Sequence, residues 1–236
     1  MNFENFKQVV EQRRSMRIFD KKAVPRDVLD ACLDLALLSP NSSNLQTWEF
    51  IVVDTEPMLS KLSAACLGQN AATTAGTLIV CLAHLDNWRQ HCDLILTNWP
   101  SRPIPKKVQF YYSRIAPFFY AQGPLNLWGL VKKIGLSCIG LFKPVPREPC
   151  SRNDMKVWAS KSSALACQTL MLALKAHGYD SCPMEGFDGV RVRRLLSLSR
   201  CNTLIPMIIS AGKGNEKGLY GPRFRFPREQ FVKYWV

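Results

Sequence analysis

The stretch from Met155 to His177 sets the first limit on the fold, because its apolar residues recur at the spacing of an α-helix and Gly178 follows directly. Glycine at that point is typical of a helix C-cap. Two further segments, 77–83 and 203–211, are largely apolar and predict buried strands. A long helix with buried strands before and after it indicates an α/β or α+β protein.

The remaining pattern adds shorter elements and no domain boundary. Helices are expected over 3–14, 25–38, 57–67 and 190–198, a strand over 48–53, and loops over 40–47 and 183–188. The chain has 236 residues, of which 47% are hydrophobic, so it can bury a core. Collagen-like, low-complexity and disordered classes are excluded. Since no linker is found, we expect one domain over 1–236.

Residues 100–150 differ from the rest in both regularity and charge. Eight prolines break this part into short helices and connections: Pro100, Pro103, Pro105, Pro117, Pro124, Pro144, Pro146 and Pro149. The chain carries 31 Lys and Arg against 18 Asp and Glu, a net charge of +13, and 102–147 holds eight bases and no acid. Aromatic residues are interleaved with these bases. Such a surplus indicates an anionic partner and leaves nucleic acid, anionic lipid and a phosphorylated ligand open.

The nine cysteines are spaced irregularly, with no CxxC pair and no histidines at zinc spacing, so no metal site is expected. Most lie in apolar runs, as buried reduced thiols do, which favours a reducing compartment. The N-terminus lacks a signal-peptide core, and the apolar stretch 124–142 is interrupted by Lys132 and Lys133. We therefore expect a cytoplasmic protein.

Two segments in the first half of the chain carry candidate binding chemistry. In Arg13-Arg14-Ser15-Met16-Arg17, guanidinium forks and a hydroxyl group suit a phosphate or the polar edge of a heterocycle. The alternative is a solvated basic turn. The loop from Ser39 to Trp48 presents side chains that both donate and accept hydrogen bonds. Its alternative is a turn whose side chains bond to their own backbone.

Two further segments lie after the long helix. In Tyr179 to Asp188, Pro183 restricts the backbone and Gly186 would let a planar ligand approach main-chain groups, unless the segment is an ordinary loop. In Gly221 to Arg228, arginines alternate with aromatic residues. An extended chain would point both guanidinium groups one way, as a phosphate clamp, although an ordinary basic tail has the same composition.

Taken in this order, the four segments resemble the FMN-dependent nitroreductase family. The resemblance covers nearly the whole chain and is weakest at 85–150. Its most specific parts are the start Arg13 to Phe19, the loop Pro40 to Trp48 (PNSSNLQTW), and the helix followed by GYDSCPMEGFD. It implies an α+β fold, with a mostly antiparallel central sheet wrapped by helices, in an interlocked homodimer with FMN at the subunit interface.

The resemblance also assigns site residues. The FMN phosphate, ribityl chain and ring edge are assigned to Arg13, Arg14, Ser15 and Arg17, with Arg223 and Arg225 closing on the phosphate. A loop reaching FMN from the other subunit is assigned to Pro40, Ser42 and Asn44. A polar contact below the ring is assigned to Gln69 and Asn70, and the backbone facing ring atom N5 to Pro183, Met184, Glu185 and Gly186.

In this family the cofactor carries the bond-making, so no catalytic side chain is assigned, and His84, His91 and His177 are interpreted as structural. The implied reaction is ping-pong: NADH or NADPH reduces the flavin, which then reduces a nitroaromatic, quinone or similar small acceptor. Thr47 stands where the family usually has proline. Residues 100–150 are longer and more basic than in small nitroreductases, and are expected to form the lid over the substrate.

Three alternatives remain beside this interpretation. The same fold supports reductive dehalogenation and other flavin reactions. A nucleic-acid-binding protein would explain the basic charge but is less favoured, because no recognition motif is present. Peripheral membrane contact through 102–147 could add to an enzyme function, since bases and aromatic residues alternate there with Leu and Ile. Against this last alternative, the same aromatic residues could cover the dimer interface and line the lid.

Overall fold

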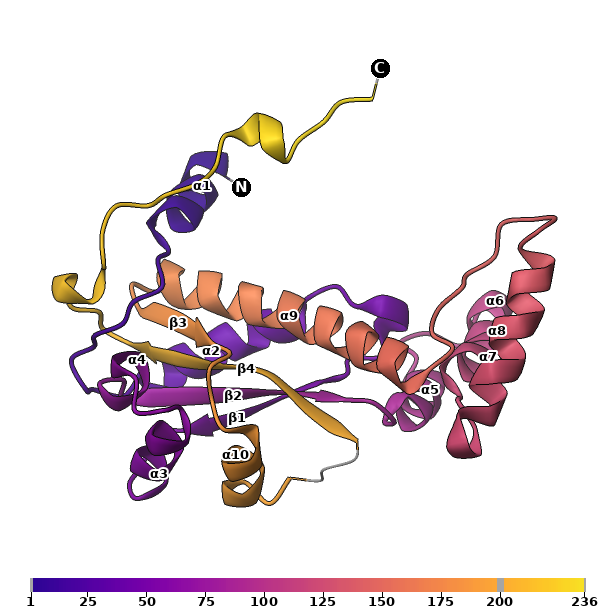
Figure 1. The fold of residues 1–236 in the computed structure, drawn as a ribbon, viewed down its shortest axis with the longest axis horizontal. Coiled ribbons are helices and arrows are strands. Elements are labelled where there is room, and N and C mark those ends of the chain that lie inside the picture. Colours follow the sequence, from indigo (N-terminus) through magenta and orange to yellow (C-terminus); the bar gives the residue numbers. More distant parts are fainter. Residues whose placement is uncertain (1, 199–201, 236) are drawn as a thin grey trace.

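The computed structural model describes residues 2–198 and 202–235, and its centre is an antiparallel sheet. The strands lie in the order β1-β2-β4-β3, and every neighbouring pair is antiparallel (Figure 1). This confirms the expected α+β class and the antiparallel sheet. The strands are β1 (Trp48–Val53), β2 (Thr77–His84), β3 (Asp180–Met184) and β4 (Thr203–Gly212).

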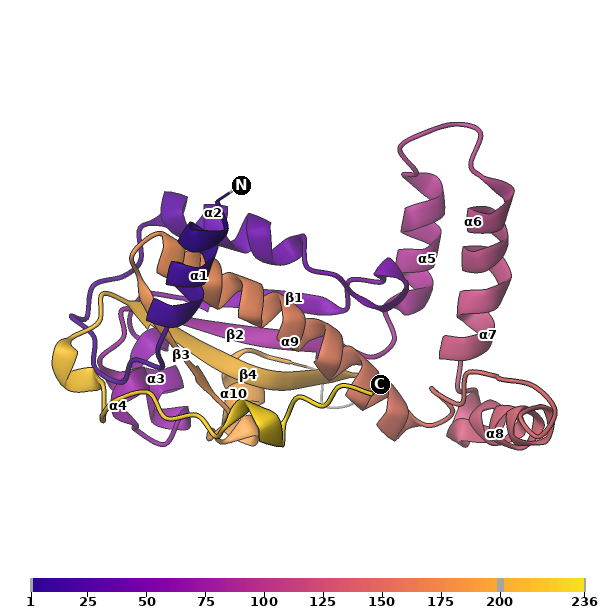
Figure 2. The same cartoon turned by 90° about the horizontal axis from the view of Figure 1, so that it is seen from above.

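Strand β2 has helices on both faces, which explains why its sequence is apolar without alternation. Leu78 and Val80 pack with α3 (Met58–Ala65) and α10 (Gly189–Leu195). Ile79 and Cys81 pack with α9 and α2 on the opposite face. Those two helices, α9 (Arg152–Ala176) and α2 (Arg26–Leu37), lie together above the sheet in Figures 1 and 2. Each fully buried aliphatic side chain stabilises this core by roughly 1.5–3 kcal/mol.

The expected loop over 183–188 is partly wrong, because Pro183 and Met184 belong to β3. A proline in the segment argues against a central strand, since proline donates no backbone hydrogen bond. However, β3 is an edge strand, where one side of the backbone needs no partner. Pro183 lies opposite Ile209 and Met184 opposite Ile208.

Helix α9 begins three residues before the expected Met155, because a capping box sets its first turn. The Ser151 hydroxyl accepts from the Asp154 N–H at 3.1 Å, and the Asp154 carboxylate accepts from the Ser151 N–H at 2.9 Å. These bonds satisfy N–H groups that have no partner within the helix.

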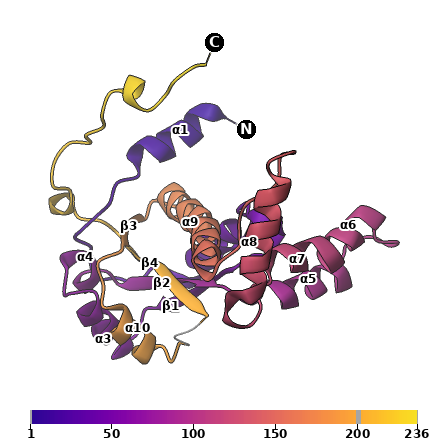
Figure 3. The same cartoon turned by 45° about the vertical axis from the view of Figure 1, so that its right-hand side comes forward.

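Two parts of the chain extend away from the sheet. Helix α1 (Phe3–Gln12) and the tail after β4 lie on one side, and the expected apolar face of α1 is exposed at Phe3, Phe6 and Val10 (Figures 1 and 3). At the opposite end, a helical projection leaves the sheet after β2, as Figure 2 shows. The projection comprises α5 (Trp88–Thr97), α6 (Lys106–Phe110), the π-helical turn η2 (Tyr111–Ile115), α7 (Ala116–Tyr120) and α8 (Leu127–Ile139).

The remaining elements are short: α4 (Asn70–Thr73), η1 (Ser42–Asn44), η3 (Pro124–Asn126), η4 (Glu216–Gly218) and η5 (Arg228–Gln230). Across residues 2–198 and 202–235, no helix combines the length and apolar character needed to span a bilayer.

Candidate functional site

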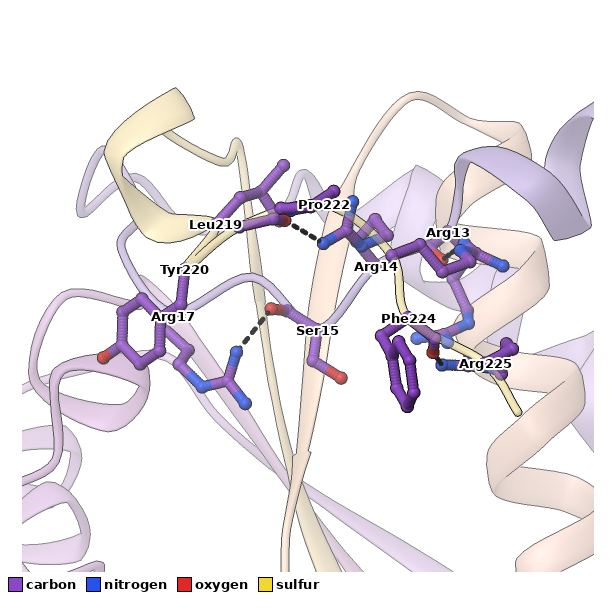
Figure 4. A pocket seen from close by; sticks show the side chains of 11 residues that line it. Arg13, Arg14, Ser15, Arg17, Leu219, Tyr220, Pro222, Phe224 and Arg225 are labelled. Atoms are coloured by element: carbon purple, nitrogen blue, oxygen red, sulfur yellow. Dashed lines mark hydrogen bonds between the residues drawn. The ribbon is translucent and has the colours of Figure 1, made fainter.

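A positively charged cavity of ≈ 320 Å³ lies between residues 13–17 and the tail segment 219–225 (Figure 4). Its lining includes no acidic residue and five arginines, namely Arg13, Arg14, Arg17, Arg223 and Arg225. Ser15 and Tyr220 add hydroxyl groups. Two of the segments identified in the sequence therefore form one site, although Arg13 and Arg223 are 210 residues apart.

The first wall of this cavity is held against the edge strand of the sheet. Helix α1 ends at Gln12, and the chain then runs beside β3, where the Met16 N–H donates to the Ser181 carbonyl at 3.1 Å. Met16 itself is buried in the core. Because successive side chains of an extended chain point in opposite directions, Ser15 and Arg17 lie on the other side, toward the cavity.

The second wall is fixed to the first by arginine side chains. Arg223 Nη2 donates to the carbonyl oxygens of Glu11 at 2.7 Å and Arg13 at 2.6 Å, at the C-terminal end of α1. Arg14 Nη2 donates to the Gly221 carbonyl at 2.6 Å. The Arg17 guanidinium lies 4.6 Å from the centre of the Tyr220 ring, and both side chains flank the cavity in Figure 4. No motif in the sequence marks Tyr220 as a site residue.

The charges in this cavity are not balanced by the chain itself. The pKa of Arg13 is lowered, first by burial and then by the positive charges of Arg223 and Arg225. A bound anion would relieve this repulsion. Several guanidinium forks around one space suit the oxygens of a phosphate group, each of which can accept more than one hydrogen bond.

A second group of predicted residues lies further along β3. The strand ends at Met184, and the Gln69 amide donates to the Gly186 carbonyl at 2.9 Å, so these two segments meet. A Cβ placed on Gly186 would meet nothing within 4 Å, so its surface is open to a ligand. From Ser181 to Gly186 the chain covers roughly 17 Å along the edge of the sheet.

Within this group the predicted residues differ in what they can offer. Met184 is buried, so its side chain faces the core and only its backbone is available at the edge. Among the described residues, the N–H groups of Glu185 and Gly186 donate to no backbone carbonyl. Asn70 is exposed at the first turn of α4.

The predicted loop residues Pro40, Ser42 and Asn44 are exposed but do not reach the cavity within one chain. The loop precedes Trp48, which pairs with Ala83 at the end of β2. The cavity adjoins Ser181, which aligns through Ala211 of β4 with Thr77 at the start of β2. The two sets are therefore separated by about 20 Å along the sheet.

A cluster of tyrosine hydroxyls, which no sequence motif marks, holds this loop. Tyr120 OH lies 2.8 Å from Ser43 Oγ and 3.1 Å from Ser42 Oγ, and Tyr111 OH lies 2.6 Å from Ser43 Oγ. Burial raises the pKa of Tyr120, while its bonds to Ser42 and Ser43 act in the opposite direction. Ser43 and Asn44 have φ of 59° and 51°, a left-handed conformation that costs free energy and needs such support.

Comparison with known proteins shows which family has this arrangement. The family model described as "Nitroreductase family" matches residues 10–213. A Thermus thermophilus protein named NADH dehydrogenase is 29% identical over 224 residues, which cover 94% of this chain and 91% of that protein.

Two solved structures share the fold. A Staphylococcus epidermidis protein, provisionally assigned as an NAD(P)H:FMN oxidoreductase, gives a TM-score of 0.77 at 22% identity and covers 100% of this chain and 98% of its own. A provisionally assigned nitroreductase in complex with FMN, from Exiguobacterium sibiricum, gives 0.71 at 23% identity, covering 98% and 97%. The architecture is thus that of the nitroreductase fold. The chain belongs to the nitroreductase family, which confirms the resemblance found in its sequence.

Proposed function

We propose that this protein is an FMN-dependent oxidoreductase that transfers reducing equivalents from NADH or NADPH to a small acceptor. The observation that carries the proposal is the cavity of five arginines without an acid, placed on the same edge strand as the open Glu185–Gly186 turn. One end suits a phosphate and the other a planar ring. The names of the relatives support the enzyme class and the cofactors expected from the sequence.

The residues present fit FMN along this edge. Arg13, Arg14, Arg223 and Arg225 would hold the phosphate, and the Ser15 hydroxyl would add a hydrogen bond. The ring would lie near Gln69 and Asn70 and over Gly186, where no side chain blocks it.

When bound, FMN supplies two-electron transfer between donor and acceptor, which would use the same ring face in turn. The chain contributes binding, orientation and charge. The N–H groups of Glu185 and Gly186 can donate to the ring edge that faces them. Arg17, held over Tyr220, would stabilise negative charge at the other ring edge.

The second part of the proposal is a homodimer in which each subunit completes the other's site. Pro40, Ser42 and Asn44 lie at the far end of the sheet from the cavity of their own chain, so a partner subunit would have to bring its copies there. Exposed aromatic side chains on α1 and the tail support such an interface: Phe3, Phe6, Phe224, Phe226, Phe231 and Trp235. In such a dimer, segment 100–150 would serve as the lid over the acceptor site.

The experiment is to purify the protein, record its visible spectrum and mass in solution, and measure NADH and NADPH oxidation with nitroaromatic, quinone and halogenated acceptors. We expect flavin absorbance with about one FMN per chain, a dimer, and donor oxidation that depends on the acceptor. The acceptor panel separates nitro or quinone reduction from reductive dehalogenation. A colourless protein that takes up no added FMN would refute the proposal.

A further inference from the structure

Helix α8 buries a charged side chain and exposes an apolar face, the reverse of an ordinary surface helix. Its buried positions are Gly129, Lys132 and Leu136, so its one inward-facing charge is a lysine that is only 3% exposed. The opposite face is aliphatic: Leu130, Val131 and Ile134 are 54%, 57% and 59% exposed. With 3.6 residues per turn, the outward residues form one stripe along the helix, consisting of Leu127, Leu130, Val131, Ile134 and Cys138.

This orientation is fixed by specific contacts, so the helix cannot roll to bury its aliphatic face. Lys132 Nζ donates to the Phe119 carbonyl at 2.5 Å and to the Pro149 carbonyl at 3.0 Å. Gly129 packs so closely that a Cβ there would lie 2.1 Å from the Cys150 carbonyl oxygen. A lysine is rarely buried unless its ammonium group is satisfied, and here it is.

The apolar surface extends beyond the helix at both ends. Leu125 is 95% exposed before α8, and Leu141 and Phe142 are 80% and 90% exposed after it. Figures 1 and 2 show α8 at the outer edge of the molecule, at the opposite end from α1, after which the arginine cavity begins at Arg13. An apolar surface of this extent marks an interaction site.

Charge determines which partner fits the stripe. Segment 102–147 contains eight bases and no acid, and Lys133, Lys143 and Arg147 are exposed beside the stripe. A symmetric contact between two copies of α8 would bring two acid-free basic segments together and repel. Nucleic acid would leave the aliphatic side chains unsatisfied, because phosphate contacts dominate its binding. An anionic lipid surface satisfies both the aliphatic face and the bases.

We propose that α8 and its flanking residues 125 and 141–142 dock this protein on an anionic lipid bilayer, with the aliphatic stripe inserted at the headgroup boundary and the bases against the lipid charges. The contact is peripheral and reversible, because one helix with few bases gives modest binding. Vesicle binding is measured separately from FMN binding, so the failure of this proposal is distinguishable from a failure of the proposed enzyme function, in which segment 100–150 also forms the lid.

The test is co-sedimentation of the full, flavin-loaded protein with phosphatidylcholine vesicles, with and without about one third phosphatidylserine. Binding should require the anionic lipid and weaken as salt is raised. Replacing Ile134 by Asp should lower partitioning about tenfold or more, because an inserted side chain becomes charged. Leu94→Asp is the matched control, since Leu94 is an exposed leucine of the same projection on α5. It should stay within about twofold of wild type.

Other outcomes would overturn the proposal. One is that the protein does not sediment with anionic vesicles, and another is that Ile134→Asp and Leu94→Asp lose vesicle binding equally. A change in the solution mass of Ile134→Asp would assign the stripe to contact with a second copy of the chain. Tighter binding to duplex DNA than to vesicles, unaffected by Ile134→Asp, would assign the charge to nucleic acid. Thermal melts of both variants establish folding, and quenching of Trp128 on α8 by brominated lipid gives an independent readout of insertion.

Discussion

The arginine cavity makes a prediction that separates phosphate recognition from flavin recognition. Arg225 is the most informative position, because its only hydrogen bond to the described chain joins it to the carbonyl of its neighbour Phe224, at 2.7 Å. Removing its side chain therefore costs the fold little. Its charge nevertheless reaches the cavity, since it lowers the pKa of Arg13 after the larger effect of burial. We expect Arg225→Ala to affect ligand binding with little effect on folding.

The size of the effect follows from the charged hydrogen bond that would be lost. Such bonds contribute about 1.5–3 kcal/mol, and because Arg225 is exposed, the lower value applies. This corresponds to about a tenfold rise in the Kd of FMN. Riboflavin has the same ring and ribityl chain but no phosphate, so its Kd should change by less than about twofold.

The assay is fluorescence titration of the flavin-free protein with FMN and with riboflavin, at low and high salt. Arg228→Ala is the matched control, because it removes one charge from the same tail at a residue outside the cavity, where Arg228 bonds to Tyr234. Equal losses for both ligands would show that Arg225 acts through the shape of the tail. An unchanged FMN affinity, or the same loss in the Arg228→Ala control, would show that Arg225 does not bind the phosphate.

Three further substitutions test local parts of the structure. Tyr120→Phe removes the hydroxyl bonds to Ser42 and Ser43, so the free energy of unfolding measured by urea titration should fall by about 1–2 kcal/mol. No loss would mean that other contacts hold the left-handed loop. Asp154→Asn removes the charged partner of the α9 capping box. Burial raises the pKa of Asp154, but its hydrogen bonds outweigh burial and hold that pKa below its ordinary value. The variant should therefore lose about 1 kcal/mol at neutral pH, and the difference should shrink as acid protonates the carboxylate. Lys132→Ala leaves two carbonyl groups unpaired and should cost about 2–4 kcal/mol, against less than about 0.5 kcal/mol for Lys133→Ala on the exposed side, as measured by thermal unfolding.

The sequence predicts an element well when the residues of that segment alone determine its structure. The segment 48–53 was predicted with its observed bounds, and β2 and α9 nearly so, because their patterns reflect burial within the segment itself. For β3 the sequence predicts a loop from Pro183 onward, because only the position of this strand at the sheet edge makes Pro183 compatible with a strand. The orientation of α8 could not be predicted, because it depends on carbonyl groups of Phe119 and Pro149 that accept from Lys132.

In the site, too, local motifs are predictable from the sequence and contacts between distant segments are not. Motif similarity identified both arginine segments, and the structure brings them together in one cavity. No local pattern could reveal that Arg223 bonds to the end of α1, or that Tyr120 supports Ser42, because these partners are distant in sequence. Polar contacts between distant segments are fixed only once the core has placed the backbones that carry them.

The positive charge of the chain is concentrated in two regions with different geometry. The cavity holds five arginines and segment 102–147 eight bases, and the bases outside these two regions equal the acids, 18 of each. The rest of the molecule is therefore balanced, and the surplus lies in the two regions that we propose bind anions. In the cavity, the arginines surround one small space, as recognition of a single phosphate requires. Beside α8, Lys133, Lys143 and Arg147 flank an aliphatic stripe, as an extended anionic surface requires. A soluble phosphate compound should therefore compete with FMN for the cavity without displacing the protein from vesicles.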